Sequence, residues 1–205
     1  MNMYQTGRTL ALALALAGIG GAALAASSQV SYLQVSGWAN AAAEQTVNRQ
    51  LAAAADAFTA QVHAIPDAGE MKGFGSLTMK TAAETDRLLS VAVDTYLIAP
   101  HQANGIARTE MKLFDKETGH EADAYTALGC DVEAVRQATL RELLHMQRQG
   151  LAIDRRAVYA KLGDPTYRPQ LFLSANGPAV YFQRGEITPS VEGAIVVVLP
   201  QLARK

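Results

Sequence analysis

Histidines and carboxylates are the side chains in this sequence best suited to chemistry. The chain has four histidines, which are His63, His101, His120 and His145. A cluster of acids occurs in the same central part of the chain and comprises Asp115, Glu117, Glu121 and Asp123. A histidine beside a carboxylate can act as a general acid or base, and three or four such side chains together can hold a metal ion. His101 and His120 are the histidines nearest to these acids in sequence.

The spacing of these residues favours neither catalysis nor metal binding. The histidines and acids match no zinc-ligand pattern. The acids surround the predicted turn Asp115–Gly119, where a solvated charged hairpin end is the typical arrangement. No Gly-x-Ser-x-Gly elbow, phosphate loop or dinucleotide fingerprint occurs in the sequence. Cys130 is the single cysteine, has no Cys/His signature around it, and is expected to be a buried free thiol. We therefore expect no catalytic residue, no metal and no cofactor.

Two helices are predicted from apolar residues that recur every three or four positions. The longer one covers Ala41–His63, with Asn40 as its N-cap, and its predicted apolar face consists of Ala43, Val47, Leu51, Ala54, Phe58 and Val62. The shorter one covers Val132–Gln149 between Asp131 and Gly150, and its predicted core residues are Val135, Leu140, Leu143 and Leu144.

Strands are predicted where apolar and polar residues alternate. A short strand is expected at Val30–Val35, and a meander is expected over 75–82, 87–98 and 106–114. Near the carboxyl end, Gln170–Ser174 and Ala179–Arg184 predict a hairpin in which Asn176 and Gly177 supply positive φ angles. The apolar run Ile195–Leu199 predicts a strand inside the sheet. The predicted fold is one α+β domain, with an antiparallel sheet packed by one long and one shorter helix.

The amino terminus has the features of a signal peptide. Arg8 precedes an apolar run, and Ala23-Leu24-Ala25 fits a cleavage site, so residues 1–25 are expected to be removed and the domain to cover 26–205. The apolar run is too short and too rich in alanine and glycine to predict a stable membrane span. The formal charge of −1 becomes −2 when Arg8 is lost, which argues against nucleic acid as a partner. We expect a periplasmic or secreted protein.

Three stretches resemble a known family in their order and spacing. The first is Val30–Leu51. The second is Arg87–Leu128, which contains Ser90-Val-Ala-Val-Asp-Thr-Tyr96 and Leu113-Phe-Asp-Lys-Glu-Thr-Gly119. The third begins at Phe172-Leu-Ser-Ala-Asn-Gly177 and continues through Glu186, Ile187, Pro189 and Gly193 to Pro200. Together they resemble the RsiV/PdaC-type extracytoplasmic domain, which occurs in lysozyme-binding anti-sigma factors and as the non-catalytic domain of a peptidoglycan deacetylase.

The resemblance implies an α+β fold at the cell envelope and a surface that binds a protein. The corresponding contact residues here would be His101, Glu186, Pro189, Ser190 and Val191. The family usually carries an aromatic residue where this chain has Gly185, and it tends to carry tyrosine after the proline, where this chain has Ser190 and Val191. The leading hypothesis is an exported binding protein without catalysis. Its partner would be a lysozyme-like muramidase, a wall-degrading toxin or peptidoglycan, in an inhibitor or immunity role.

Two alternatives remain open. The first is an envelope enzyme acting on peptidoglycan, in which His101 or His120 would need to lie within hydrogen-bond reach of Asp115, Glu117 or Glu121. The second is a structural envelope protein that binds wall glycan through exposed aromatic rings such as those of Trp38 and Tyr167.

Overall fold

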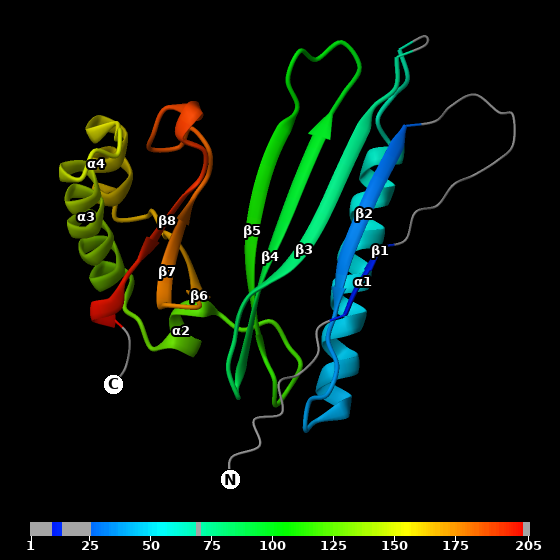
Figure 1. The fold of residues 1–205 in the computed structure, drawn as a ribbon, viewed down its shortest axis with the longest axis horizontal. Helices are drawn as coiled ribbons and strands as arrows, with labels where there is room; N and C mark the ends of the chain where they lie inside the picture. The colour runs from blue at the N-terminus through cyan, green and yellow to red at the C-terminus, as the bar shows by residue number, and fades with distance from the viewer. Residues whose placement is uncertain (1–9, 14–25, 69–70, 203–205) are drawn as a thin grey trace, which may run out of the picture. The chain divides into compact units, whose positions relative to one another are not determined.

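The structure is a computed structural model that describes residues 10–13, 26–68 and 71–202 (Figure 1). The described residues form two compact units. The first holds residues 10–13, 26–68, 71–81, 92–110 and 114–120, and the second holds 82–91, 111–113 and 121–202. The predicted cleavage site lies outside the described residues.

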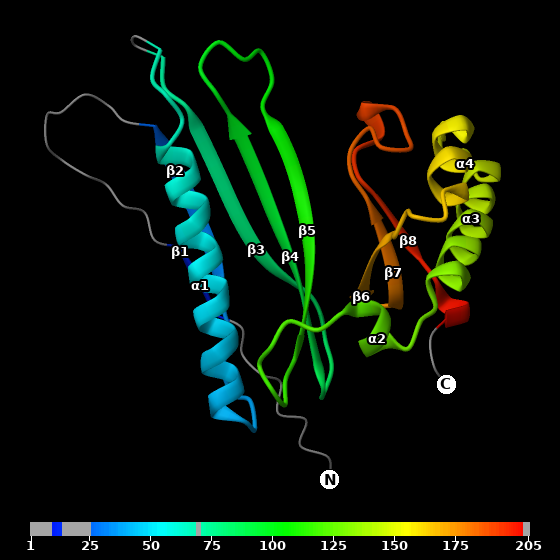
Figure 2. The ribbon, with the colours of Figure 1, turned by 180° about the vertical axis from the view of Figure 1, so that it is seen from behind.

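The first unit contains one long helix and most of a five-stranded sheet. Helix α1 covers Ala41–His63, and the sheet has the order β1-β2-β3-β4-β5. These strands are Leu10–Ala13, Ser27–Gln34, Phe74–Glu84, Leu88–Ile98 and Ile106–Asp115. In the views from the front and from behind, α1 runs along β2 (Figures 1 and 2). β1 falls within the segment that was predicted to be a signal peptide, and it pairs antiparallel with β2.

The sequence prediction of α1 and its cap is confirmed. Asn40 Oδ1 accepts hydrogen bonds from the amides of Ala42 and Ala43, which would otherwise lack partners at the helix start. The buried face differs from the prediction at one position, because Ala55 rather than Ala54 is buried. Helix and sheet approach closely at Gly75, where a Cβ would lie 2.2 Å from Cγ2 of Val62.

Strand β2 runs parallel to β3, whereas the predicted sheet was antiparallel throughout. The reason is the connection between them: α1 carries the chain back along the sheet, as parallel neighbours require. The predicted meander of β3, β4 and β5 is present with boundaries close to those expected.

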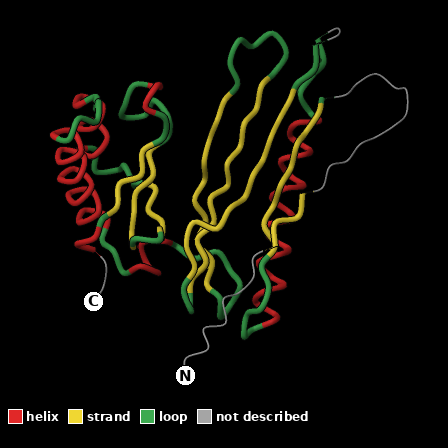
Figure 3. Tube along the Cα trace, viewed as in Figure 1, coloured by secondary structure: helices red, strands yellow, loops and turns green. Residues whose placement is uncertain are grey.

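The second unit contains a three-stranded sheet and three helices (Figure 3). Its sheet has the order β6-β7-β8, with β6 at Gln170–Ser174, β7 at Gly177–Phe182 and β8 at Ile195–Val198. Its helices are α2 at Ala124–Leu128, α3 at Val132–Arg148 and α4 at Arg155–Gly163. Two 3₁₀ turns, η1 at Ser190–Glu192 and η2 at Pro200–Leu202, flank β8. The predicted α+β class is confirmed, with the strands divided between two sheets.

Three details of the second unit correct the sequence predictions. β8 lies at the edge of its sheet instead of inside it, and its side chains alternate, so Val196 is 43% exposed. Helix α3 and the core cover the face that carries Ile195 and Val197, although the run is apolar at every position. In the β6–β7 turn, Gly177 has a φ of +101°, whereas Asn176 is not among the described residues with positive φ. In α3, the buried residues include Ala138 and Thr139, whereas Leu140 and Leu144 are half-buried.

Asn48 gives a direct test of how α1 is attached to β2. Its Oδ1 accepts a hydrogen bond from the Val35 amide at 2.8 Å, and its Nδ2 donates to the Val35 carbonyl at 2.9 Å. Replacing Asn48 with alanine leaves both backbone groups of Val35 without these partners, so we expect a loss of about 1–3 kcal/mol in unfolding free energy. Urea denaturation would measure it, with Asn104→Ala in an exposed loop as the control, expected to change stability by less than about 0.5 kcal/mol. Equal effects of the two substitutions would contradict the role assigned to Asn48.

Candidate functional site

The segment Gly185–Gly193, here called the bend, connects β7 to β8 and contains four of the five predicted contact residues. Glycine begins and ends it with positive φ angles, +75° at Gly185 and +77° at Gly193. Such angles are strained for other residues. A Cβ at Gly185 would also lie 2.9 Å from Oγ of Ser190, so a larger residue there would require the Ser190 side chain to move.

The base of the bend is anchored in the second unit. Ile187 and Thr188 are only 1% and 4% exposed, and Ile187 belongs to the hydrophobic core of this unit. The carbonyl of Ile187 accepts a hydrogen bond of 2.8 Å from the amide of Asp154, the N-cap residue of α4. The two residues therefore tie the bend to both the core and α4.

The Glu186 carboxylate closes the start of the bend. Its Oε2 accepts a hydrogen bond of 2.6 Å from the Gln183 amide, while the Glu186 amide donates to the Gln183 carbonyl at 3.0 Å. Its Oε1 lies 3.1 Å from Nζ of Lys161 and accepts from the Tyr167 hydroxyl at 3.2 Å. Lys161 also lies over the Tyr167 ring, 5.1 Å from its centroid. Burial, reinforced by the Glu186 charge, raises the pKa of Tyr167 well above its usual value.

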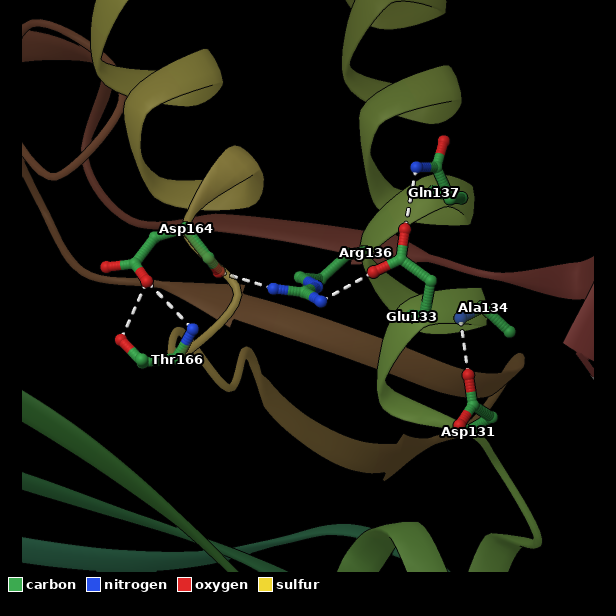
Figure 4. Close-up of polar contacts among 7 residues, drawn as sticks. All are labelled: Asp131, Glu133, Ala134, Arg136, Gln137, Asp164 and Thr166. Atoms are coloured by element: carbon green, nitrogen blue, oxygen red, sulfur yellow. Dashed lines mark hydrogen bonds and ion pairs between the residues drawn. The ribbon is translucent and has the colours of Figure 1, made fainter.

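The segment that carries Tyr167 is held from two sides. From α3, Arg136 donates to the Asp164 carbonyl and also pairs with Glu133, while Asp164 Oδ1 accepts from the amide and hydroxyl of Thr166 (Figure 4). These Thr166 hydrogen bonds lower the pKa of Asp164. From α2, the Tyr125 hydroxyl donates to the Pro169 carbonyl at 2.8 Å. These contacts hold the segment before β6, which carries Tyr167, the residue whose hydroxyl donates to Glu186.

The tip of the bend faces solvent. Pro189 and Ser190 are exposed, and Val191 is 88% exposed. Arg184 Nε donates to the Ser190 carbonyl at 2.7 Å, and the Glu192 amide donates to the Pro189 carbonyl. The bend is thus a short loop that is fixed at its base and presents an apolar side chain at its tip.

His101, the fifth predicted contact residue, belongs to the first unit. It lies exposed in the loop between β4 and β5, and its φ of +64° makes it the one non-glycine residue with positive φ among those that the structure describes. The bend belongs to the second unit and the His101 loop to the first.

The acids that the enzyme alternative would need make other structural contacts. Asp115 Oδ1 accepts hydrogen bonds from the amides of Glu117 and Thr118, which shapes the β5 turn. Glu121 pairs with Lys112 at 3.0 Å, and His120 is exposed. Across residues 10–13, 26–68 and 71–202, no group of three histidine, cysteine or acidic side chains could hold a metal ion.

The aromatic residues considered for glycan binding are half-buried. Lys116 Nζ lies over the Trp38 ring, 5.2 Å from its centroid, and Lys161 covers the Tyr167 ring in the same manner. Cys130, predicted to be buried, is half-buried, and its Sγ lies 3.6 Å from the Leu128 carbonyl oxygen. None of the helices in the described part of the chain has the length and apolar character needed to cross a membrane.

Comparison with solved structures identifies the fold. A DUF3298 family protein from Pseudomonas aeruginosa PAO1 aligns with a TM-score of 0.62 at 14% identity, over 96% of this chain and 90% of its own. The fold is that of DUF3298 proteins. A DUF3298 member from Bacteroides fragilis NCTC 9343 aligns with a TM-score of 0.60 at 11% identity, over 95% of this chain and 90% of its own. No protein-family model and no curated protein matches the sequence. At such identities the DUF3298 likeness concerns the fold alone.

Sequence reasoning selected the bend but missed its supports. The bend is contacted by Lys161 of α4, by the α4 N-cap residue Asp154 and by Tyr167 in the segment before β6. The spacing of these residues along the chain matches no motif. The available signal was Ile187, an isolated large aliphatic residue between polar neighbours, which is typical of a loop anchored in a core.

The stabilising contribution of the buried Tyr125 hydroxyl should be lost at alkaline pH. Burial raises the pKa of Tyr125 to about 12 in the folded protein, above its ordinary value of 10. The raised pKa means that the contribution of Tyr125 to the unfolding free energy is complete below pH 10 and is lost as pH rises from 10 towards 12. The loss is up to about 1.4 kcal/mol per pH unit. Urea denaturation between pH 9 and pH 12 should show a shallower loss in Tyr125→Phe than in the wild type. The control is Tyr159→Phe, because Tyr159 is 51% exposed, and it should keep the wild-type slope. Identical slopes in the two variants would refute the assignment.

Proposed function

We propose that this chain is an exported binding protein without catalysis, and that it recognises a lysozyme-like muramidase through the bend. The single observation that carries the proposal is the contrast within the bend: Ile187 is 1% exposed, and Val191, four residues later, is 88% exposed. An apolar side chain held out in solvent on an anchored loop contributes favourable free energy when a partner protein covers it. Inhibition of the muramidase, or immunity against a wall-degrading toxin, is the role that follows.

The likeness to DUF3298 structures supports the envelope setting of this proposal. That family is related to the RsiV/PdaC-type domain, which the sequence resembles in three ordered stretches. The signal-peptide features of residues 1–25 support export. The absence of catalysis is supported by the turn contacts of Asp115 and the ion pair of Glu121, because these acids already have structural partners.

The His101 loop is proposed as a second contact surface. A non-glycine residue with a φ of +64° carries backbone strain on the order of 1 kcal/mol, and such strain persists where it serves a purpose other than packing. The His101 side chain is exposed, so a partner could contact it.

Binding of muramidases with matched valine variants tests the proposal. We expect purified protein to form a complex with at least one lysozyme class at micromolar concentration or below, and to slow its lysis of bacterial walls. Val191→Ser should weaken the complex about tenfold, since an interface anchor contributes roughly 1–2 kcal/mol. Val196→Ser, at the half-exposed valine of β8, should bind within about twofold of wild type. Isothermal titration calorimetry measures both.

Two outcomes would contradict the proposed function in different ways. If no muramidase binds at micromolar concentration, the muramidase proposal is wrong. If the protein instead sediments with insoluble peptidoglycan and the Val191 variant does so equally, the alternative of wall-glycan binding replaces it.

A further inference from the structure

A pocket of about 470 Å³ opens beside the bend within the second unit. Its walls come from the end of α3, the segment Leu151–Asp154, the start of α4 and bend residues Gly185–Pro189. The volume lies within the range of about 300–1,000 Å³ that is usual for small-molecule sites. The pocket and the exposed tip share the bend: Thr188 lines the pocket, and Val191 lies three residues further along the chain.

Polar groups that line the pocket already have partners within the protein. Glu186 pairs with Lys161 at 3.1 Å, and Asp154 Oδ1 caps α4 by accepting from the Ala157 amide at 3.1 Å. Gln147 Oε1 accepts a hydrogen bond of 2.7 Å from Nε of Arg155. An entering anion would lie beside the carboxylates of Glu186 and Asp154, and an entering cation would compete with Lys161 for Glu186 and with the helix amide for Asp154. Either ion would also lose its hydration, so the pocket favours an uncharged group.

The walls combine aliphatic surface with hydrogen-bonding groups. Leu151, Ile153, Ala157 and Ile187 supply the aliphatic part, and the lining residues include no aromatic ring on which a sugar would stack. Thr188 is only 4% exposed, and its Oγ1 has no hydrogen-bond partner among the described residues. An aliphatic side chain flanked by peptide groups matches this combination better than a sugar or an ion does.

We propose that this pocket receives one leucine-like side chain from an uncharged peptide segment of the protein partner that contacts the tip of the bend. This inference rests on the proposed binding function and specifies the chemistry of the partner. The side chain packs against Leu151, Ile153 and Ile187, and the neighbouring peptide groups form hydrogen bonds at the rim. Pro189 lines the pocket and precedes Val191 by two residues, so one partner segment could contact both.

Nuclear magnetic resonance with blocked tripeptides tests the pocket directly. The probes are acetyl-Gly-X-Gly-amide with X as leucine, alanine, lysine or glutamate, added to the whole protein carrying labelled methyl groups. We expect the leucine peptide to shift the methyl signals of Leu151, Ile153 and Ile187 saturably, with at least fivefold tighter binding than the other three. No saturable shift, or equal binding of the charged peptides, would overturn the inference. So would shifts of these signals by N,N′-diacetylchitobiose in the absence of any response to the leucine peptide.

A pair of alanine substitutions in α4 supplies the matched control. Ala157→Leu fills the pocket and Ala160→Leu adds the same group on the exposed side of the same helix, and both keep a strong helix former. Peptide binding should fall at least tenfold in the first variant and stay within twofold of wild type in the second. Equal effects in the two variants would overturn the inference.

Muramidase binding by the same variants separates this inference from the proposed function. A tenfold loss of muramidase affinity in Ala157→Leu, with Ala160→Leu unchanged, supports the pocket inference. If Ala157→Leu binds the muramidase as wild type does while Val191→Ser is weakened, the proposed function stands and the pocket inference is wrong. If the leucine peptide binds but no muramidase does, the pocket stands and the muramidase is the wrong partner.

Discussion

The Glu186 carboxylate and the buried Ile187 side chain determine the shape of the candidate surface. One carboxylate oxygen closes the chain on the Gln183 amide, and the other meets Lys161 and the Tyr167 hydroxyl. Ile187 then places its side chain in the core of the second unit. Thr188 is also buried, and the chain leaves the core at Pro189, so Val191 lies in solvent beyond a fixed base.

The rest of the second unit supplies the partners of these two residues. Helix α4 contributes Lys161 and, through its cap, Asp154; the segment before β6 contributes Tyr167. That segment is itself held by Arg136 of α3 and Tyr125 of α2 (Figure 4). Loops that carry binding residues on rigid elements are a common solution, because the scaffold restricts the loop before the partner arrives and so lowers the entropy lost on binding.

The elements with strong local periodicity could be predicted from the sequence. Helix α1 and the three-strand meander follow from apolar spacing and occur close to where expected. The β6–β7 hairpin is also present, but its second strand is Gly177–Phe182 where Ala179–Arg184 was predicted. The position of β8 could not be predicted, because the continuous apolar run Ile195–Leu199 suggests a strand with two covered faces. In the structure one face of this edge strand meets α3 and the core, and Val196 faces solvent. The parallel pairing of β2 with β3 likewise depends on the crossover through α1, which a local pattern does not report.

The candidate site was predictable in location but not in construction. Glycines at 185 and 193 and Pro189 mark an irregular segment between two strands, which is enough to select it. The Lys161, Tyr167 and Asp154 contacts join residues that are 19 to 33 positions apart in sequence, and no spacing rule relates them.

Hydrogen exchange of individual amides tests the claim that the base of the bend is fixed while its tip is free. We predict that the Gln183 and Glu186 amides exchange at least a hundredfold more slowly than the Val191 amide, and that Glu186→Ala removes most of this difference. Equally fast exchange at all three amides in the wild-type protein would contradict the account.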